Sequence, residues 1–450
     1  AAGRRGRHPR GGPGLPGRVR GDALRRARGG GLLCRERPAL RHARLLRSIE
    51  AAACISLVAL LILDWRSDDA TSIASRPLPE EGPEALEVRV HRGPALPAWR
   101  GSYEQLFVAA AGELEVDIAI LTVPRFDTLC LLHGGIVARR YCLMGHDYQV
   151  PYGPWGTREA LPDKHELHCR LLDSTTALCT SQHLAEYLRR WSEGRMDARL
   201  CYCADYGYFD PPADVGPGAF PPKLCAGGDC VTLISPCPSK GLPIVLRLAL
   251  MLGNVRFLCV STGWTKTLHE VQLRAHPNIE VVQGTDDVDS LYRRTALLLM
   301  PSLWAESFGL VAVEAQLRGI PVVSTDACGL SEANLLPELR VPDVPLVHDS
   351  RTRHMLRGVT MREAEAALDP LRPGHDKTEE SIQRPLVQQA HTFIATEAEA
   401  SGFASRIRGL LEDPGRRKTL GSRARELAIA HVEGRRGRFV RMLHELVAEA

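Results

Sequence analysis

The sequence predicts an α/β protein with two domains of the Rossmann type, in each of which helices cover a parallel sheet. Three observations lead to this fold class. A chain of 450 residues has room for two sizeable hydrophobic cores. Short apolar runs typical of buried strands alternate with helical segments over residues 86–210 and again over residues 231–324. A Pro- and Gly-rich stretch, roughly residues 211–228, separates the two series and is interpreted as a linker.

Composition limits the classes of function. Hydrophobic residues make up 44% and charged residues 24% of the chain, which is ordinary for a soluble globular protein. Residues 1–47 hold 14 Arg, no Lys and two acids, a net +12 against +4 for the whole chain, so the remainder carries −8. This mildly acidic remainder gives no indication of nucleic-acid binding. The 13 cysteines lack zinc-ligand spacing beyond the pair Cys201 and Cys203, so we expect buried thiols and no metal site.

We divide the chain as follows: residues 1–47, rich in Arg, Gly and Pro and expected to be disordered; 48–84, an apolar run and polar stem; 85–228, a first Rossmann-like domain; 229–400, a second Rossmann-like domain with a polar insertion at about 343–391; and 401–450, C-terminal helices. The first residue is Ala rather than Met, as expected of a fragment or of translated sequence outside the folded protein.

The apolar run at residues 51–63 leaves two alternatives open. It is shorter than the roughly 20 residues that span a bilayer, but arginines precede it and a polar stem follows, as in a membrane anchor. The alternative is a buried strand of the first sheet, although the next 20 residues show no helix that would complete a crossover. The first alternative implies membrane contact and an endomembrane location, and the second a cytoplasmic location.

In the first domain, five apolar runs are expected to be strands: residues 86–91, 116–123, 141–144, 176–180 and 201–210. A helix is expected to begin at Ser102, and another follows the fourth strand because four large apolar side chains share one face: Leu184, Tyr187, Leu188 and Trp191. His146 follows the third strand, at the edge where parallel sheets present residues to ligands.

In the second domain, a strand from Val231 leads through a Pro-rich loop into a helix. Further strands are expected at residues 257–261 and 280–283, and helices close the chain at 403–411 and 416–447.

The most informative stretch covers residues 297–324. Its two apolar runs, 297–300 and 320–324, read as buried parallel strands, and 308–318 between them has helical character. Glu306 lies just before this helix and Glu314 within it, on the face that looks back toward the loop. The backbone N–H groups of Ser307 and Phe308, together with the next residue, form a helix start suited to anionic oxygens such as phosphate.

Residues 301–323 read P-S-x-W-x-E-S-F-G-L-V-x-x-E-A-x-x-R-G-x-P-V-V, which resembles the donor-site signature of retaining GT-B glycosyltransferases of the group 1 type. In that family the first glutamate sits beside the transferred sugar and the second holds the nucleotide ribose. The resemblance therefore implies these roles for Glu306 and Glu314. It also implies that Gly309, Leu310 and Val311 offer backbone amides to the diphosphate and the sugar.

The resemblance implies further site residues outside this stretch. Lys240, followed by Gly241 in the loop before a helix, is placed to meet the donor phosphate with its ammonium group. Many family members carry an arginine where this chain has Ser235, so another cation such as Lys266 is a candidate to serve instead. His146 is in a position comparable to that of a histidine that lies near the sugar in related enzymes. The glycine-rich acceptor loop of the family is poorly matched, residues 93–101 being the nearest candidate.

The resemblance implies a GT-B fold, with an acceptor domain at residues 85–228, a donor domain at 229–400 and a donor cleft between them. It also implies the activity of a hexosyltransferase that retains anomeric configuration. The partners would be a nucleotide-sugar donor and an unknown acceptor, with no cofactor. No Asp-x-Asp motif is placed at the site, so we expect metal independence. Two alternatives remain open: a GT-B-type nucleotide-sugar epimerase or phosphorylase, and a catalytically silent sugar-nucleotide-binding protein.

Overall fold

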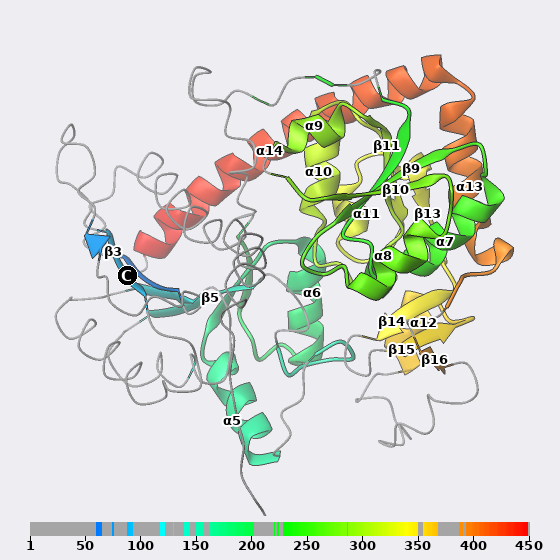
Figure 1. The fold of residues 1–450 in the computed structure, drawn as a ribbon. Helices are drawn as coiled ribbons and strands as arrows, with labels where there is room; N and C mark the ends of the chain where they lie inside the picture. Colours follow the sequence, from blue (N-terminus) through cyan, green and yellow to red (C-terminus); the bar gives the residue numbers. More distant parts are fainter. Residues whose placement is uncertain are drawn as a thin grey trace, which may run out of the picture.

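The protein is described here from a computed structural model (Figure 1). The described residues are 60–64, 74–75, 88–92, 118–121, 129, 139–144, 150–156, 162–201, 220, 223–224, 228–285, 287–349, 354–367, 387–389 and 393–448. Several sequence predictions therefore lie outside the described residues: the tail at 1–47, residues 51–59 of the apolar run, the acceptor loop at 93–101, the helix beginning at Ser102, His146, and residues 202–210 of the fifth strand.

The second domain is built on a six-stranded parallel sheet, of which the sequence predicts the first five strands. Its strands are β8 (Cys230–Ile234), β9 (Arg256–Ser261), β10 (Ile279–Gln283), β11 (Thr295–Met300), β12 (Val322–Thr325) and β13 (Arg340–Val341). They lie in the order β10-β9-β8-β11-β12-β13. The chain therefore builds outward in one direction from β8 and in the other from β11. This reversal makes the space beyond the ends of β8 and β11 the expected ligand position.

Helices cover both faces of this sheet. They are α7 (Leu242–Met251), α8 (Thr267–Arg274), α9 (Val288–Tyr292), α10 (Leu310–Leu317), α11 (Leu330–Ala333), α13 (Glu397–Leu411) and α14 (Pro414–Ala448). Alternate residues of β11 enter different cores: Leu297 and Leu299 pack with α7 and α13, whereas Leu298 and Met300 pack with α10 and α14. Such two-sided burial explains why these strands are continuous apolar runs in the sequence.

The first domain contains a four-stranded parallel sheet in the order β4-β5-β6-β7. Its strands are β4 (Ile118–Leu121), β5 (Arg139–Met144), β6 (Thr176–Cys179) and β7 (Ala198–Leu200). The hydrogen bonds between β7 and β6 run from Asp197 to Cys201, so a polar residue begins a pairing that the apolar pattern did not indicate. Residues 202–210 of the predicted strand at 201–210 lie outside the described residues.

Two helices pack on this sheet. The helix α6 (Gln182–Trp191) buries the four predicted apolar side chains, and the Leu184 amide donates to the Ser181 side chain (3.1 Å) as an N-cap. The helix α5 (Pro162–Asp173) was not predicted from the sequence.

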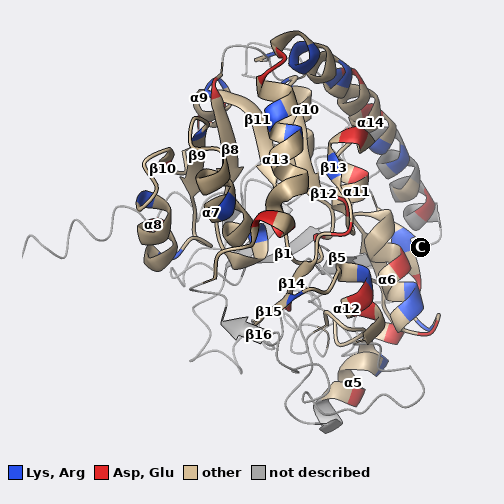
Figure 2. Ribbon diagram, turned by 90° about the vertical axis from the view of Figure 1, so that its right-hand side faces the viewer, with Lys and Arg blue, Asp and Glu red and all other residues tan. Residues whose placement is uncertain are grey.

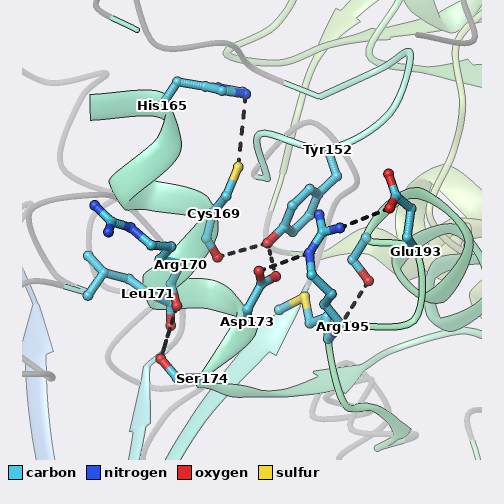
Figure 3. A network of polar contacts seen from close by, with 11 residues as sticks. Tyr152, His165, Cys169, Arg170, Leu171, Asp173, Ser174, Glu193 and Arg195 are labelled. Carbon is cyan, nitrogen blue, oxygen red and sulfur yellow. Dashed lines mark hydrogen bonds and ion pairs between the residues drawn. The ribbon is translucent and has the colours of Figure 1, made fainter. Parts of the chain in front are cut away.

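Figure 3 shows how α5 is fastened to the 150–156 segment. The Tyr152 hydroxyl donates to the Cys169 carbonyl (2.9 Å) and to the Asp173 carboxylate, which also accepts from Arg195 Nε (3.1 Å). Burial first, and then the Asp173 hydrogen bond and charge, raise the pKa of Tyr152, so it remains a neutral donor.

A third sheet, in the order β1-β3-β2, lies toward the N-terminus. Its strand β1 (Leu60–Asp64) runs parallel to β3 (Val88–Arg92), and β2 (Ala74–Ser75) runs antiparallel to β3. Residues 60–63 of the apolar run therefore lie in a strand, whereas residues 51–59 are outside the described residues and the membrane anchor stays a prediction. In the part of the chain that the structure describes, none of the helices combines the length and the apolar character of a membrane span.

The polar segment at 343–391 contains an antiparallel sheet of β14 (Leu346–Asp349), β15 (His354–Arg357) and β16 (Val387–Gln389), with α12 (Met361–Ala367) beside it. Val347, Leu356 and Ala364 are buried in the same core as Trp155 and Trp191 of the first domain. This segment is therefore one part of the second domain that packs against the first.

Candidate functional site

Two loops meet at the point where the strand order reverses. One follows β8 and contains η4 (Pro238–Lys240), and the other, residues 301–309, follows β11. The Leu303 amide donates to the Ser239 carbonyl (2.8 Å), which joins the loops. Gly241 has a φ of 89°, and a Cβ at this position would lie 2.1 Å from the Pro301 carbonyl oxygen. Only glycine therefore permits this approach of the two loops.

The loops bring together two residues that the sequence analysis singled out. Lys240 Nζ donates to Glu306 Oε1, and the Ser302 hydroxyl donates to the same oxygen (2.8 Å). Burial tends to raise the pKa of the Glu306 carboxyl, but the charge and hydrogen bond of Lys240 and the hydrogen bonds of Trp304 and Ser302 outweigh it. The pKa of Glu306 is therefore lowered, and the buried carboxylate is anionic. The Lys240 side chain is 27% exposed, so part of it faces solvent.

Two tryptophans, which sequence analysis did not place in the site, lie beside this ion pair. The Trp304 ring centroid is 4.9 Å from Lys240 Nζ, a cation–π contact. The Trp264 ring lies 6.3 Å from that of Trp304 and is 61% exposed, on the loop after β9. A tryptophan directly after a parallel strand is the signal that could have suggested it.

The start of α10 provides the second part of the site. Gly309 caps this helix with a φ of 117°, and a Cβ there would lie 2.7 Å from Leu330 Cδ2. The first amides of a helix have no intrahelical acceptor, so the N–H groups at Leu310 and Val311 suit an anionic ligand. The Gly329 amide donates to the Glu306 carbonyl (2.7 Å) and holds the loop that leads into this helix start.

The side chain of Phe308 is directed away from the Lys240 pair. It is buried against α14, where the His431 ring stacks on it at 6.0 Å and Arg435 Cζ lies 3.9 Å from its ring centroid. Any contribution of Phe308 to ligand binding is therefore through its backbone.

Glu314 lies in a separate network. It is buried, and the Tyr292 hydroxyl donates to Glu314 Oε2 (3.2 Å). Arg318 Nη1 donates to the Glu314 carbonyl (3.1 Å), while Arg318 Nε donates to Asp289 Oδ1 (2.6 Å). Burial first, and then the charge of Glu314, raise the pKa of Tyr292, which keeps the phenol a hydrogen-bond donor.

Ser235, which stands where many family members have an arginine, and Lys266, the candidate substitute cation, lie in neighbouring loops. The Ser235 hydroxyl is 2.8 Å from the Thr262 hydroxyl, and the backbone of Ser235 has a φ of 60°. Lys266 is exposed at the N-cap of α8, where its amide donates to His269 Nδ1 (3.1 Å). The structure therefore places one cation, Lys240, directly on Glu306 and leaves Lys266 on the adjacent loop.

Among the described residues, no group of three or more His, Cys, Asp or Glu side chains could hold a metal ion. The described cysteines are free thiols, and five of them are buried: Cys179, Cys201, Cys230, Cys237 and Cys259. Burial raises the pKa of Cys179 and of Cys259 to about 12, so both are neutral.

Two α/β domains with a donor-type loop and helix after β11 define the GT-B class of fold. The glycosyltransferase from Rickettsia africae has this fold and aligns with a TM-score of 0.50 at 12% identity, over 80% of this chain and 86% of its own. The HepE structure from Anabaena, in complex with UDP-glucose, aligns with a TM-score of 0.49 at 15% identity, over 81% of this chain and 86% of its own.

Residues 233–343 match the family model described as "Glycosyl transferases group 1". The resemblance of the sequence to this family is thereby confirmed over this part of the second domain. The D-inositol 3-phosphate glycosyltransferases of Mycobacterium tuberculosis (H37Rv) and Mycobacterium bovis (AF2122/97) are 36% identical to this chain over 106 residues. That match covers 21% of this chain and 22% of each relative, so the chain spans about a fifth of the length of the curated relatives it matches.

Proposed function

We propose that the protein transfers a hexose from a nucleotide-sugar donor to an acceptor, with retention of anomeric configuration. The observation that carries the proposal is the contact between Lys240 and the buried Glu306 at the strand reversal, inside the segment that matches group 1 glycosyltransferases. The name of the mycobacterial relatives supports glycosyl transfer as the reaction class. The proposal leaves the acceptor of this protein open and does not extend to it the acceptor of these relatives.

In this proposal Lys240 and the α10 amides stabilise the negative charge of the leaving diphosphate. Charge develops there as the sugar departs, so groups already fixed in place lower the barrier. Glu306 orients the transferred sugar, Glu314 holds the nucleotide ribose, and His146 lies near the sugar. We further propose that these cationic and amide groups make a metal ion unnecessary, which addition of a chelator would test.

The ribose role requires Glu314 to accept bonds from a ligand as well as from Tyr292. A carboxylate has about four lone-pair sites, so it can accept a hydroxyl hydrogen bond without losing the phenol donor. Its neighbour Arg318 donates to Asp289 and to the Glu314 carbonyl. Glu314 is thus fixed in position before the ligand arrives, which lowers the ordering cost of binding.

The test begins with a thermal-shift screen of UDP, GDP, ADP and their hexose derivatives, since a ligand bound only by the folded state raises its melting temperature. Each stabilising donor is then incubated with candidate acceptors, and NMR determines the anomeric configuration of the product. The proposal expects an α-linked product from an α-linked donor, and loss of transfer in Lys240→Ala.

Other outcomes of the same experiment would contradict the proposal. An epimerised donor without transfer would indicate an epimerase, and release that requires phosphate would indicate a phosphorylase. Binding without any turnover, unchanged by Lys240→Ala, would indicate a silent sugar-nucleotide-binding protein.

A further inference from the structure

The helix α6 of the first domain is held at its C-terminal end by the second domain. The Trp191 indole N–H donates to Glu365 Oε1 of α12 (3.4 Å), and Arg190 Nη1 lies 3.7 Å from the same oxygen. This contact is continuous with the core that Trp191 shares with β14, β15 and α12. One end of α6 is therefore fixed by packing and by a charged contact.

The N-terminal end of α6 is held by a different residue of the second domain. Glu332, at α11, accepts hydrogen bonds from the amides of Gln182 (3.0 Å) and His183 (2.7 Å). First-turn amides lack intrahelical acceptors, and the helix dipole places positive charge at this end. Glu332 therefore supplies from one domain an anionic cap for a helix of the other.

Arg435 of α14 joins this cap to the candidate site. It is 1% exposed; its Nη1 donates to the Thr180 carbonyl just before α6 (3.3 Å), and its Nη2 lies 3.8 Å from Glu332 Oε2. Its Cζ also lies 3.9 Å from the ring centroid of Phe308, in the loop before α10. In Figure 2, α14 carries basic residues along its length and passes beside α11 toward α6.

A buried guanidinium is stable only when its surroundings compensate its charge. Three separate segments provide that compensation here: the chain before α6, the end of α11, and the ring of Phe308. Because the guanidinium is planar and rigid, a shift of any one partner loosens its contacts with the other two. The position of α6 is therefore coupled through Arg435 to the position of Phe308.

Phe308 is covalently next to Gly309, which caps α10, so its ring fixes the backbone of the loop that carries Glu306. We propose that Arg435 is a positioning residue for the transfer reaction: it aligns the donor loop of the second domain with the helix α6 of the first. The inference rests on the proposed function, because it assumes that both domains contribute to one reaction. Arg435 and Glu332, the two residues of the second domain that contact the chain at the start of α6, are called the Arg435–Glu332 bracket below.

The experiment compares the full-length protein with Arg435→Met, Arg435→Lys and Glu332→Gln. Lys418→Met is the matched control, because it removes an exposed positive charge from the same helix. Hydrogen exchange measures the amides of Gln182 and His183 and those of residues 301–309. Binding of UDP and GDP is measured by calorimetry, and kcat and KM are measured with a donor found in the screen.

In Arg435→Met we expect about tenfold faster exchange at the start of α6 and in the 301–309 loop. Nucleotide affinity should stay within about threefold, while kcat falls by about tenfold or more, because the phosphate groups of the site are intact but misaligned. Arg435→Lys should recover part of kcat, since it restores the charge without the planar fork. Glu332→Gln should speed exchange of the two α6 amides while the nucleotide affinity is unchanged.

The inference is overturned if Arg435→Met and Glu332→Gln both match Lys418→Met in exchange and in kcat. A uniform rise in exchange over the whole second domain in both variants would also overturn it, because that is the result of a purely structural role. If the unchanged protein turns over no nucleotide-sugar, the proposed function fails. The exchange data at α6 and at residues 301–309 still decide whether the Arg435–Glu332 bracket couples the two domains.

Discussion

The Lys240 ammonium pairs with the Glu306 carboxylate, which is 5% exposed, and lies over the ring of Trp304 at the same time. The lysine is therefore positioned by two contacts, and its side chain is still partly exposed. An incoming diphosphate would meet a cation whose direction is already set. The same arrangement makes the buried carboxylate dependent on its partner, which can be tested without knowing the substrate.

We expect Lys240→Ala to lower the free energy of unfolding by about 1–3 kcal/mol, because it leaves a buried carboxylate without its counter-charge. Adding Glu306→Gln should recover part of this loss, since the amide carries no charge to compensate. The free energies of unfolding in urea of the two single variants, the double variant and the unchanged protein form a double-mutant cycle. Purely additive effects would mean that the two side chains are not coupled in solution.

Substitution of the two signature glutamates should affect different steps, nucleotide binding for Glu314 and transfer for Glu306. Glu314→Ala should weaken nucleotide binding by about ten- to a hundredfold, the cost of a charged hydrogen bond of roughly 1.5–3 kcal/mol. Glu306→Ala should chiefly slow transfer, because this carboxylate lies by Lys240 rather than by Tyr292. Calorimetry with the nucleotide and initial rates with the donor separate the effects, with the exposed Glu397→Ala as control. Small and equal effects would contradict both assignments.

The sequence predicted the β11–α10–β12 unit because its strands are buried on both faces and are therefore continuous apolar runs. It could not predict that Lys240 and Glu306 touch, since 66 residues separate them and the contact depends on the order of the strands. The same limit applies to Arg435, which no local pattern distinguishes and whose role depends on the segments that lie beside α14 in the fold.

The polar segment at 343–391 shows a different limit of sequence reasoning. Its strands are only three or four residues long, so alternation is too brief to be recognised against the charged residues around it. Its buried residues Val347 and Leu356 contact the first domain, a core that no local pattern indicates.

We expect Gly329→Ala to destabilise the loop that carries Glu306. A Cβ at this position would lie 2.3 Å from the carbonyl carbon of Ser307, so the backbone of the loop must move. The loss in unfolding free energy should be about 1–3 kcal/mol, as for other overpacked sites, with weaker nucleotide binding. Gly253→Ala is the matched control, because a Cβ there meets nothing within 4 Å. Similar unfolding curves for the two variants would show that the approach to Ser307 is looser than described.

The last prediction concerns acid pH and two histidines next to the Arg435–Glu332 bracket. Burial lowers the pKa of His183 to about 4, although Glu186 acts in the opposite direction. The pKa of His431 is also lowered to about 4, by burial first and then by the charges of Arg435 and Arg438. Both histidines are therefore neutral in the folded protein at pH 7.

In the unfolded chain a histidine takes up a proton near pH 6.5, whereas the folded protein takes it up only near pH 4 at these two positions. Between these values the unfolded state binds more protons, so the free energy of unfolding falls as the pH is lowered from 6.5 toward 4 and is unaffected by these groups above pH 7. Each histidine should contribute a loss of roughly 1–2 kcal/mol between pH 7 and pH 5. Urea unfolding at pH 7 and pH 5 is compared between the unchanged protein and the double variant His183→Gln/His431→Gln. The carboxylates titrate in both proteins, so the difference gives the contribution of the two histidines to the pH dependence. Equal pH dependence in the two proteins would mean that the histidines are accessible to protons in the folded state, and the packing of α14 against Phe308 and α6 would have to be looser than the structure has it.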